Sequence, residues 1–408
     1  MRNVLTFILA GGKGERLNPL TRDRAKPAVP FGGIYRIIDI TLSNCINSGL
    51  RRIYVLTQYK SFSLQKHLLS GWLDIVSSQL GEFIDLIPAQ QRVSADWYLG
   101  TADAIYQNMY AISDTNPEHI LILAGDHVYK MNYQDMLDQH LTNKADVTVS
   151  CIPMPVETSS AFGVVEVDDN GCVCGFQEKP KHPRTIPGAP DQIFASMGIY
   201  LFNKDSLCEE LEIDAKTPLS QHDFGRNIIP QMLKRDRRVY AYNFSDSQGR
   251  PKYWRDIGTR DAYYQANMDL VKYGGEFNIY DRSWPLRTNH IQYPPSKTVS
   301  YINQNGSRID SVIVDSLISG GCVVEGATVK GSVLSPSVKV EYGAQVLNSV
   351  VMNNVTIGHG ARIQNAIIDK EVKIAPGAQI GYNAEEDRKL FDVTASGIVI
   401  VGKRESVG

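Results

Sequence analysis

The sequence predicts an α/β protein in two parts: a doubly wound, mostly parallel sheet followed by a C-terminal left-handed parallel β-helix. Two observations carry this prediction. Apolar, strand-like runs alternate with helical stretches over residues 1–280, and a 17-residue repeat occupies the C-terminal region of the 408-residue chain. We therefore expect one domain at 1–280, a linker at 281–305 and the β-helix at 306–408.

Four runs in the first part are apolar throughout instead of alternating: residues 4–10, 52–57, 119–124 and 146–152. Such strands are buried on both faces, which is typical of a parallel sheet covered by helices. Helical stretches at 38–48, ended by Gly49, and at 133–141 supply such cover. The run at 4–10 is short for a secretion signal and leads into a glycine loop, so we interpret it as the first strand.

The repeat at the C-terminal end reads [VI]-x-x-G-A-x-[VI]. Its copies start at Val323, Val340, Ile357 and Ile374, and a second apolar column keeps the same step at Leu317, Leu334, Val351 and Ile368. A copy this small buries its apolar face only against its neighbours, so the copies are expected to stack as coils of short strands. Between the two parts, Pro285, Pro294 and Pro295 stand among polar residues, which indicates a linker.

The overall charge narrows the class of ligand. A net charge of -2 gives no basis for binding nucleic acid or an anionic membrane, so any phosphate site must be built locally. The six cysteines follow no common metal or disulfide spacing, which favours reduced thiols in a cytoplasmic protein. No run approaches the roughly 18 apolar residues that span a bilayer.

The segment 9–17, LAGGKGERL, is a candidate phosphate loop. It contains three glycines, Gly11, Gly12 and Gly14. Glycines let the backbone approach a phosphate so that its N–H groups point at the oxygens, here at the carboxyl end of the first strand. The spacing matches neither the Walker loop nor the dinucleotide fingerprint. Arg16, Arg24 and Lys26 add positive charge nearby; the alternative is a tight turn with solvated charges.

Two carboxylates are candidates for a metal site. Asp126 ends the apolar run at 119–124, and Asp256 lies in the segment YWRDIGT at 253–259. Mg²⁺ prefers oxygen ligands and often takes one or two carboxylates together with substrate phosphates. The alternatives are a cap on the next helix for Asp126 and an ion pair with a neighbouring arginine for Asp256.

The pattern L-A-G-G-x-G-x-R-L followed by A-K-P resembles the nucleotidyltransferase family of sugar-1-phosphate pyrophosphorylases. The resemblance implies that Arg16 and Lys26 are catalytic and steady a nucleoside triphosphate, and that Asp126 and Asp256 hold the metal, Asp126 taking part in catalysis. It identifies residues 1–280 as the catalytic domain and the β-helix as a site of oligomerisation or regulation. The nucleotide contacts in the loop would be Leu9, Ala10, Gly11, Gly12 and Gly14.

The segment FQEKP at 176–180 is a candidate sugar-phosphate site. Glu178 can accept from sugar hydroxyls while Lys179 meets the phosphate, although a solvated strand end explains the same residues. The segments AFGV at 161–164 and ASMGIY at 195–200 are similar to the sugar-binding segments of the same family. The resemblance implies sugar contacts by Gly163 and Ser196.

Four further segments resemble the bacterial ADP-glucose pyrophosphorylases within that family: PAQQR at 88–92, WYLGTADA at 97–104, HDFG at 222–225 and YWRDIGT at 253–259. This resemblance implies a homotetramer in which Tyr98 lies against the substrates and Gln91, Gly100 and Thr101 contact the nucleotide. Gln91 and Trp254 would lie on loops that link effector binding to turnover. Packing of the aromatic residues under a loop is the alternative.

One position departs from the family pattern. Relatives that respond to sugar-phosphate activators carry a basic residue where this chain has Asp23. A carboxylate repels a bisphosphate, so we expect weak activation by fructose 1,6-bisphosphate or a different effector. Arg24 and Arg36 remain as candidate regulatory anion ligands.

The expected reaction is attack by glucose 1-phosphate on the α-phosphorus of ATP, giving ADP-glucose and pyrophosphate, with Mg²⁺ as cofactor. By resemblance, this is the activating step of bacterial glycogen synthesis and is allosterically regulated. Three alternatives remain: a pyrophosphorylase that uses UTP or dTTP, a non-catalytic regulatory subunit of the same fold, and an acyltransferase acting through His359 of the β-helix.

Overall fold

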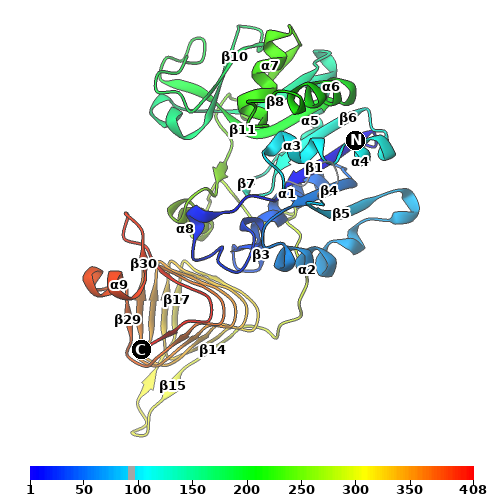
Figure 1. The fold of residues 1–408 in the computed structure, drawn as a ribbon. Coiled ribbons are helices and arrows are strands. Elements are labelled where there is room, and N and C mark those ends of the chain that lie inside the picture. Colours follow the sequence, from blue (N-terminus) through cyan, green and yellow to red (C-terminus); the bar gives the residue numbers. More distant parts are fainter. Residues whose placement is uncertain (91–96) are drawn as a thin grey trace.

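The computed structural model describes residues 1–90 and 97–408. Figure 1 shows a helix-flanked sheet and a β-helix that lie next to each other. The chain crosses between them after helix α8 (Arg260–Val271) and enters the β-helix at β14 (Lys297–Val299). No helix in the described part of the chain is long and apolar enough to cross a membrane.

The first part is built on a nine-stranded sheet with the main order β10-β9-β11-β6-β1-β4-β5, in which β8 joins β11 and β12. Its strands are β1 (Val4–Leu9), β4 (Arg52–Thr57), β5 (Phe83–Pro88), β6 (His119–Ala124), β8 (Val147–Pro155), β9 (Gly163–Val167), β10 (Val173–Glu178), β11 (Gln192–Asn203) and β12 (Val239–Asn243). Strands β6, β1, β4 and β5 run parallel, as the wholly apolar runs predict. Antiparallel pairs gather around the long strand β11 on the other side of β6.

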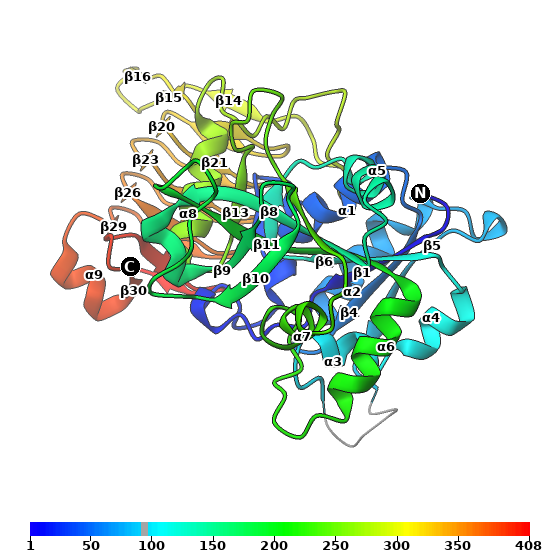
Figure 2. The same cartoon turned by 90° about the horizontal axis from the view of Figure 1, so that it is seen from above.

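Helices cover both faces of the sheet, which confirms the doubly wound α/β prediction (Figure 2). One face carries α1 (Ile37–Asn47), α2 (Phe62–Gly71) and α5 (Tyr133–Thr142), and the other carries α3 (Thr101–Tyr106), α4 (Met109–Thr115), α6 (Lys204–Ala215) and α7 (Ile229–Lys234). Gly49 follows α1 with a φ of 82°, a conformation that favours glycine and ends the helix as predicted.

A buried carboxylate fixes the helices below the candidate phosphate loop. Asp39 of α1 is fully buried and lies 2.6 Å from Nε2 of His67 on α2. It also accepts hydrogen bonds from the Trp72 indole at 2.9 Å and from the Thr288 hydroxyl at 2.7 Å. Because Thr288 lies in the crossing segment, this one group joins two helices to the chain that leads into the β-helix.

The β-helix has three faces of parallel strands, and this confirms the fold read from the repeat. The first face contains β14, β19 (Val323–Glu325), β22 (Lys339–Val340), β25 (Thr356–Ile357), β28 (Lys373–Ile374) and β32 (Ser406–Val407). The second contains β17 (Val312–Val314), β20 (Thr328–Lys330), β23 (Gln345–Leu347), β26 (Arg362–Gln364) and β29 (Gln379–Ile380). The third contains β18 (Leu317–Ile318), β21 (Val333–Leu334), β24 (Val350–Val351), β27 (Ala366–Ile368), β31 (Val399–Val401) and β30 (Asp392–Val393), the last of them antiparallel.

The first coil departs from the 17-residue step. Val324, not Val323, lies opposite Val340, and Ile318, not Leu317, lies opposite Leu334. Val324 is buried in the β-helix core. Where the repeat offers two adjacent apolar residues, the one that points into the core therefore takes the place in the apolar column. Strand β14 already pairs with β19, so the β-helix begins inside the segment 281–305.

Two insertions interrupt the coils. A hairpin of β15 (Tyr301–Ile302) and β16 (Arg308–Ile309) projects between β14 and β17, and helix α9 (Ala384–Leu390) follows β29.

The two parts meet in an apolar interface that contains a buried ion pair. Tyr263 and Leu270 of α8 belong to the same buried cluster as Val350 and Ile367 on the outside of the β-helix. Beside them, Nη2 of Arg24 donates to both carboxylate oxygens of Asp369, with 2.6 Å to Oδ1. Only 5% of the Arg24 side chain is exposed, and none of the Asp369 side chain.

Replacing Asp369 by Asn should lower the free energy of unfolding by about 3 kcal/mol, because the buried Arg24 guanidinium loses its counter-charge. Urea denaturation measures the change. The matched control is Asp310→Asn, since Asp310 pairs with Arg308 while both side chains are about two thirds exposed; it should cost less than about 0.5 kcal/mol. Equal losses in the two variants would contradict a structural role for the buried pair.

Candidate active site

A cavity of about 600 Å³ opens at the carboxyl ends of the parallel strands β1, β4 and β6. It is lined by Leu9, Gly11, Gly12, Lys13, Leu56, Gln58, Tyr59, Tyr98, Leu99, Gly100, Thr101, Ala104, Ala124, Asp126, His127, Gly198, Tyr200, Asp223, Phe224 and Gly225. This is the edge of an open sheet at which ligands bind. We call this first cavity the loop cavity.

A second cavity of about 220 Å³ continues from the first. The residues common to both are His127, Gly198, Tyr200, Asp223 and Gly225. Its remaining lining residues include Gly163, Glu178, Lys179, Ser196, Trp254 and Asp256. We call it the strand-end cavity. The two cavities share these five residues and together form one continuous site.

The predicted phosphate loop lies in the loop cavity. Leu9, Gly11 and Gly12 line it, whereas Ala10 is buried beneath and donates its N–H to the carbonyl of Leu56 at 2.9 Å. Gly14 has a φ of 66°, and a Cβ there would lie 3.3 Å from Cβ of Lys26. Gly14 therefore serves the turn that packs the loop against Lys26.

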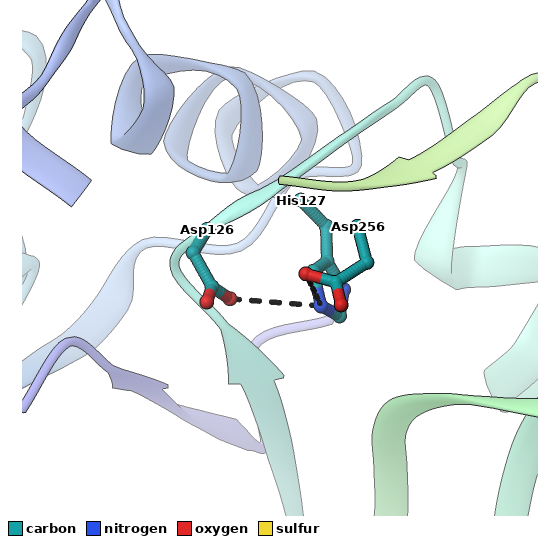
Figure 3. A group of neighbouring side chains, drawn as sticks. All are labelled: Asp126, His127 and Asp256. Atoms are coloured by element: carbon teal, nitrogen blue, oxygen red, sulfur yellow. Dashed lines mark ion pairs between the residues drawn. The ribbon is translucent and has the colours of Figure 1, made fainter. Parts of the chain in front are cut away.

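The two predicted metal ligands lie together although 130 residues separate them in the sequence. Asp126 follows β6, and Asp256 ends β13 (Trp254–Asp256), which pairs antiparallel with β7 (His127–Tyr129). This pairing sets Asp256 opposite His127. Figure 3 shows the resulting group: Nε2 of His127 is 3.6 Å from Asp126 and 3.7 Å from Asp256.

Lys26 joins the same group and connects the two acids. Its Nζ lies 2.5 Å from Asp126 Oδ2 and 3.5 Å from Asp256 Oδ1, with 10% of the side chain exposed. Burial works to lower the pKa of Lys26, but the two carboxylates outweigh it and raise that pKa. Burial works to raise the pKa of Asp126, and Lys26 and then His127 lower it to about 2. Lys26 and Asp126 are therefore both charged at neutral pH.

Neither alternative for the two acids holds. The helix after Asp126, α5, is capped by Asn132, whose side chain accepts from the N–H of Gln134. The arginine next to Asp256, Arg255, pairs with Asp269 at 2.7 Å.

The donor set fits a divalent cation. One ligand atom each from Asp126, His127 and Asp256 can be chosen so that all three lie within 4.8 Å of one another. Two carboxylates in a cavity open to a phosphate loop are the ligands that Mg²⁺ takes together with substrate phosphates. A ring nitrogen suits Mg²⁺ less well, so His127 fits better as a neighbour that orients the acids.

The strand-end cavity contains all four residues predicted for the sugar phosphate. Glu178 ends β10, and Nζ of Lys179 lies 3.7 Å from its carboxylate. A Cβ on Gly163 would lie 2.7 Å from the Phe176 ring and 3.1 Å from Glu178, so only glycine fits there. Ser196 lines the wall next to Gly198. Glu178 and Lys179 thus face a cavity and not only bulk solvent.

The start of α3 is held by a turn from a distant part of the chain. The carbonyl of His222 accepts the N–H of Ala102 at 2.8 Å, and a Cβ on Gly100 would lie 2.2 Å from that oxygen. Thr101 donates its hydroxyl to Asp223 at 3.0 Å. Gly100 and Thr101 are therefore positioned as a unit with Asp223.

Buried contacts hold the His222 turn itself in place. Nδ1 of His222 lies 2.7 Å from Asp214, which is buried at the end of α6.

The three aromatic residues Trp97, Tyr98 and Trp254, for which packing under a loop was the alternative, lie in different surroundings. Tyr98 lines the loop cavity and accepts from Asn108 at 3.0 Å, and Trp97 is 52% exposed. Trp254, which the resemblance places on a loop, lies on β13 because that segment pairs with β7. It is buried edge-on to His127 in the wall of the strand-end cavity. Gln91 falls outside the described residues.

Arg16 is exposed and lines neither cavity. A Cβ on Gly258 would lie 2.9 Å from Asp256 and 3.4 Å from Nη2 of Arg16, so the guanidinium reaches the side of the site that holds Asp256.

Arg24 and Arg36 lie away from both cavities, in a cationic cluster between the two parts of the chain. We define this cluster as Arg24, Arg36, Lys370 and Lys403. Burial, with a contribution from Arg24, lowers the pKa of Arg36 to about 10. Burial and then Arg36 and Arg24 lower the pKa of Lys370 to about 7. Asp369 is the acid paired with Arg24 at this cluster.

Sequence reasoning assigned no role to several lining residues, among them His127, Tyr200, Asp223 and Gln58. His127 stands next to Asp126 in the sequence, and Asp223 lies in the quoted segment HDFG, so both carried a signal. Tyr200 ends the segment ASMGIY at 195–200 and so carried a signal too, whereas Gln58, which follows β4, carried none, because only the sheet order brings it to the site.

Comparison with known proteins identifies the relatives of this chain. A nucleotidyl transferase family model matches residues 5–273, and a GlmU-like C-terminal hexapeptide model matches residues 294–401. A glucose-1-phosphate adenylyltransferase of Koribacter versatilis is 51% identical over 100% of this chain and 97% of its own length. One from Methylobacillus flagellatus is 50% identical over 98% of this chain and 93% of its own length. Glucose-1-phosphate adenylyltransferase 2 of Vibrio parahaemolyticus is 49% identical, over 98% of both chains.

Similarity at this level over the whole chain confirms the resemblance seen in the motifs. The chain belongs to the glucose-1-phosphate adenylyltransferase family of nucleotidyl transferases.

Proposed function

We propose that this protein transfers the adenylyl group of ATP to α-D-glucose 1-phosphate, giving ADP-glucose and pyrophosphate. One observation carries the proposal: a glycine loop, two acids that Lys26 joins from beneath the cavity wall and a Glu–Lys pair belong to one continuous site, which the loop, the acids and the pair line. That the relatives named above are glucose-1-phosphate adenylyltransferases supports ATP and glucose as the substrates. By the same relationship, the reaction is the activating step of bacterial glycogen synthesis.

The residues divide between the two substrates. The nucleotide occupies the loop cavity, where Gly11, Gly12, Gly100 and Thr101 form the walls and Arg16 meets the triphosphate. Glucose 1-phosphate occupies the strand-end cavity. There Glu178 accepts from sugar hydroxyls, Lys179 binds the phosphate, and Gly163 and Ser196 contact the ring.

Chemistry at this site needs alignment and charge stabilisation, and no protein nucleophile. The phosphate of glucose 1-phosphate is already ionised and attacks the α-phosphorus directly, so no general base is required. Lys26 and Arg16 stabilise the negative charge that the transferred group and pyrophosphate carry. A divalent cation held by Asp126 and Asp256, which we infer to be Mg²⁺, supplies further neutralisation of that charge.

We infer that the enzyme is a cytoplasmic homotetramer. All six cysteines are free in the structure, which agrees with a reducing compartment. The exposed hairpin and first coil of the β-helix present apolar side chains, with Ile302 66%, Val312 41% and Val314 44% exposed. Such a surface is suited to contact with another subunit.

We infer that the cationic cluster binds a regulatory anion. Arg24 is buried, and its like-charged neighbours Arg36, Lys370 and Lys403 are only partly exposed; this crowding of positive charge is costly, and a bound phosphate would relieve it. Asp23 lies beside the cationic cluster, where it pairs with Arg22 at 3.5 Å and attracts the positive charge of Arg404. Its charge opposes a second phosphate group, so we expect a weak response to fructose 1,6-bisphosphate.

Pyrophosphate release from purified protein with Mg²⁺ and glucose 1-phosphate should be dominated by ATP in a comparison with UTP, dTTP, CTP and GTP. Asp126→Asn should fold but lose turnover on the order of 1,000-fold, because it removes one ligand of the metal. A dominant rate with UTP or dTTP would move the protein to another branch. If none of the five nucleotides gave pyrophosphate release, the result would favour a non-catalytic regulatory subunit.

Replacing Lys179 by Gln should raise KM for glucose 1-phosphate about ten- to hundredfold and change kcat much less, because it removes mainly ground-state binding of the phosphate. Steady-state kinetics at saturating ATP measure both constants. Lys181→Gln is the matched control, since Lys181 is exposed and lines neither cavity. An unchanged KM in Lys179→Gln would place this residue outside the site.

Binding of sulfate at the cationic cluster should weaken as pH rises from 7 to 8.5. Lys370, with a pKa of about 7 in the ligand-free chain, must take up a proton to pair with the anion. Sulfate affinity should fall by up to about tenfold per pH unit. In Lys370→Met the affinity should no longer depend on pH over this range. Isothermal titration calorimetry measures it, and Lys339→Met, an exposed lysine paired with Glu341, is the control. A pH-independent affinity in the unmodified protein would exclude Lys370 from the anion site.

A further inference from the structure

We propose that Lys26 is a built-in competitor of the divalent cation: in the substrate-free protein its ammonium occupies the metal position between Asp126 and Asp256, and it leaves when metal and nucleotide enter. The inference rests on the proposed function, because it takes these two acids as the metal ligands. It goes further by giving Lys26 a different partner before and after the substrate binds.

The contacts of Nζ support the first position. Nζ lies 2.5 Å from Asp126 Oδ2 and 3.5 Å from Asp256 Oδ1, and so contacts one oxygen of each acid. A divalent ion held by these two acids would contact the same carboxylates, so it would take the position that the ammonium now has. Ammonium and metal cannot both occupy it, because like charges at such short range repel strongly.

The glycine loop packs against this lysine, so a triphosphate bound by the loop would be the second partner of its ammonium. A Cβ on Gly14 would lie 3.3 Å from Cβ of Lys26, so the glycine loop that meets the triphosphate packs on the same side chain. The backbone of Lys26 is fixed in a short helical turn (Lys26–Ala28) in which its carbonyl accepts the N–H of Val29. A lysine has a flexible four-carbon stem, so Nζ can move from the acids to a phosphate while the backbone stays in place.

The unused polar atoms of the site agree with an arrangement that awaits a ligand. Nδ1 of His127 is buried without a hydrogen-bond partner among the described residues, and so is the indole nitrogen of Trp254 against which His127 packs. The acids themselves are 28% and 31% exposed, so an incoming ion can reach them from the cavity. The lysine therefore balances the charge of the two acids until the substrates arrive.

A direct test is Mn²⁺ binding to the substrate-free protein, followed by the electron paramagnetic resonance signal of free Mn²⁺. Lys26→Met should bind Mn²⁺ about tenfold more tightly than the unmodified protein, because no ammonium competes. Lys26→Gln should do the same and covers the case in which the methionine variant does not fold. Lys26→Arg keeps the charge and should not gain affinity.

Two controls separate competition from a general effect of charge. Lys130→Met removes a lysine that pairs with Asp281 at 3.0 Å, outside the group of acids, and should leave Mn²⁺ affinity unchanged. Adding Asp126→Asn to Lys26→Met should abolish the gain. If the gain persists in that double variant, the ion binds elsewhere and the proposal is wrong.

The outcomes also distinguish this proposal from the proposed function. Equal Mn²⁺ affinity in the unmodified, Lys26→Met and Lys26→Gln proteins would overturn the role of Lys26 as competitor. If the unmodified protein still released pyrophosphate from ATP with Mn²⁺, the proposed function would stand. Failure of every protein to bind Mn²⁺, with no release from any nucleotide, would overturn both.

Discussion

The position of Lys26 between Asp126 and Asp256 is the interaction on which the site depends. The two acids come from strands far apart in the sequence, and only the antiparallel pairing of β13 with β7 sets Asp256 opposite His127. Two carboxylates this close would repel each other without a cation, and the ammonium of Lys26 supplies it. The glycine loop packs on the same lysine through Gly14, so the loop and the pair of acids share one residue.

The β-helix is attached to the catalytic part next to this lysine. Arg24 points into the interface and pairs with Asp369 of the β-helix, while Lys26, two residues on, points at Asp126 and Asp256. The carbonyl of Ala25 between them accepts the N–H of Ala28, which starts the short turn that holds Lys26. Arg24 and Lys26 are therefore separated by a single residue, Ala25, whose carbonyl is hydrogen-bonded, so a change in the ion pair of Arg24 occurs close to Lys26. This is a short physical connection between the cationic cluster and the active site.

Local patterns in the sequence predict those features that local physics controls. Wholly apolar strands, Gly49 after α1 and the repeat of the β-helix each follow from burial or backbone conformation within a few residues. The glycine loop and the segment at 176–180 carry their chemistry in short motifs, and the family resemblance extends this to Asp126 and Asp256. The step of the first coil could not be predicted, because Val323 and Val324 are equally apolar and the neighbouring coil decides which one is buried. Likewise, the pairing of Arg24 with Asp369 and the position of Trp254 on a strand depend on contacts across the whole chain.

The central claim is that one metal-and-lysine centre at Asp126 and Asp256 serves adenylyl transfer. A crystal structure with Mn²⁺, a non-hydrolysable ATP analogue and glucose 1-phosphate tests it most directly, because anomalous scattering locates the ion without assumptions. The account predicts an anomalous peak between the two carboxylates, the triphosphate over Gly11 and Gly12, and Nζ of Lys26 on a phosphate oxygen. A peak elsewhere, with Lys26 still held between the two acids, would contradict it.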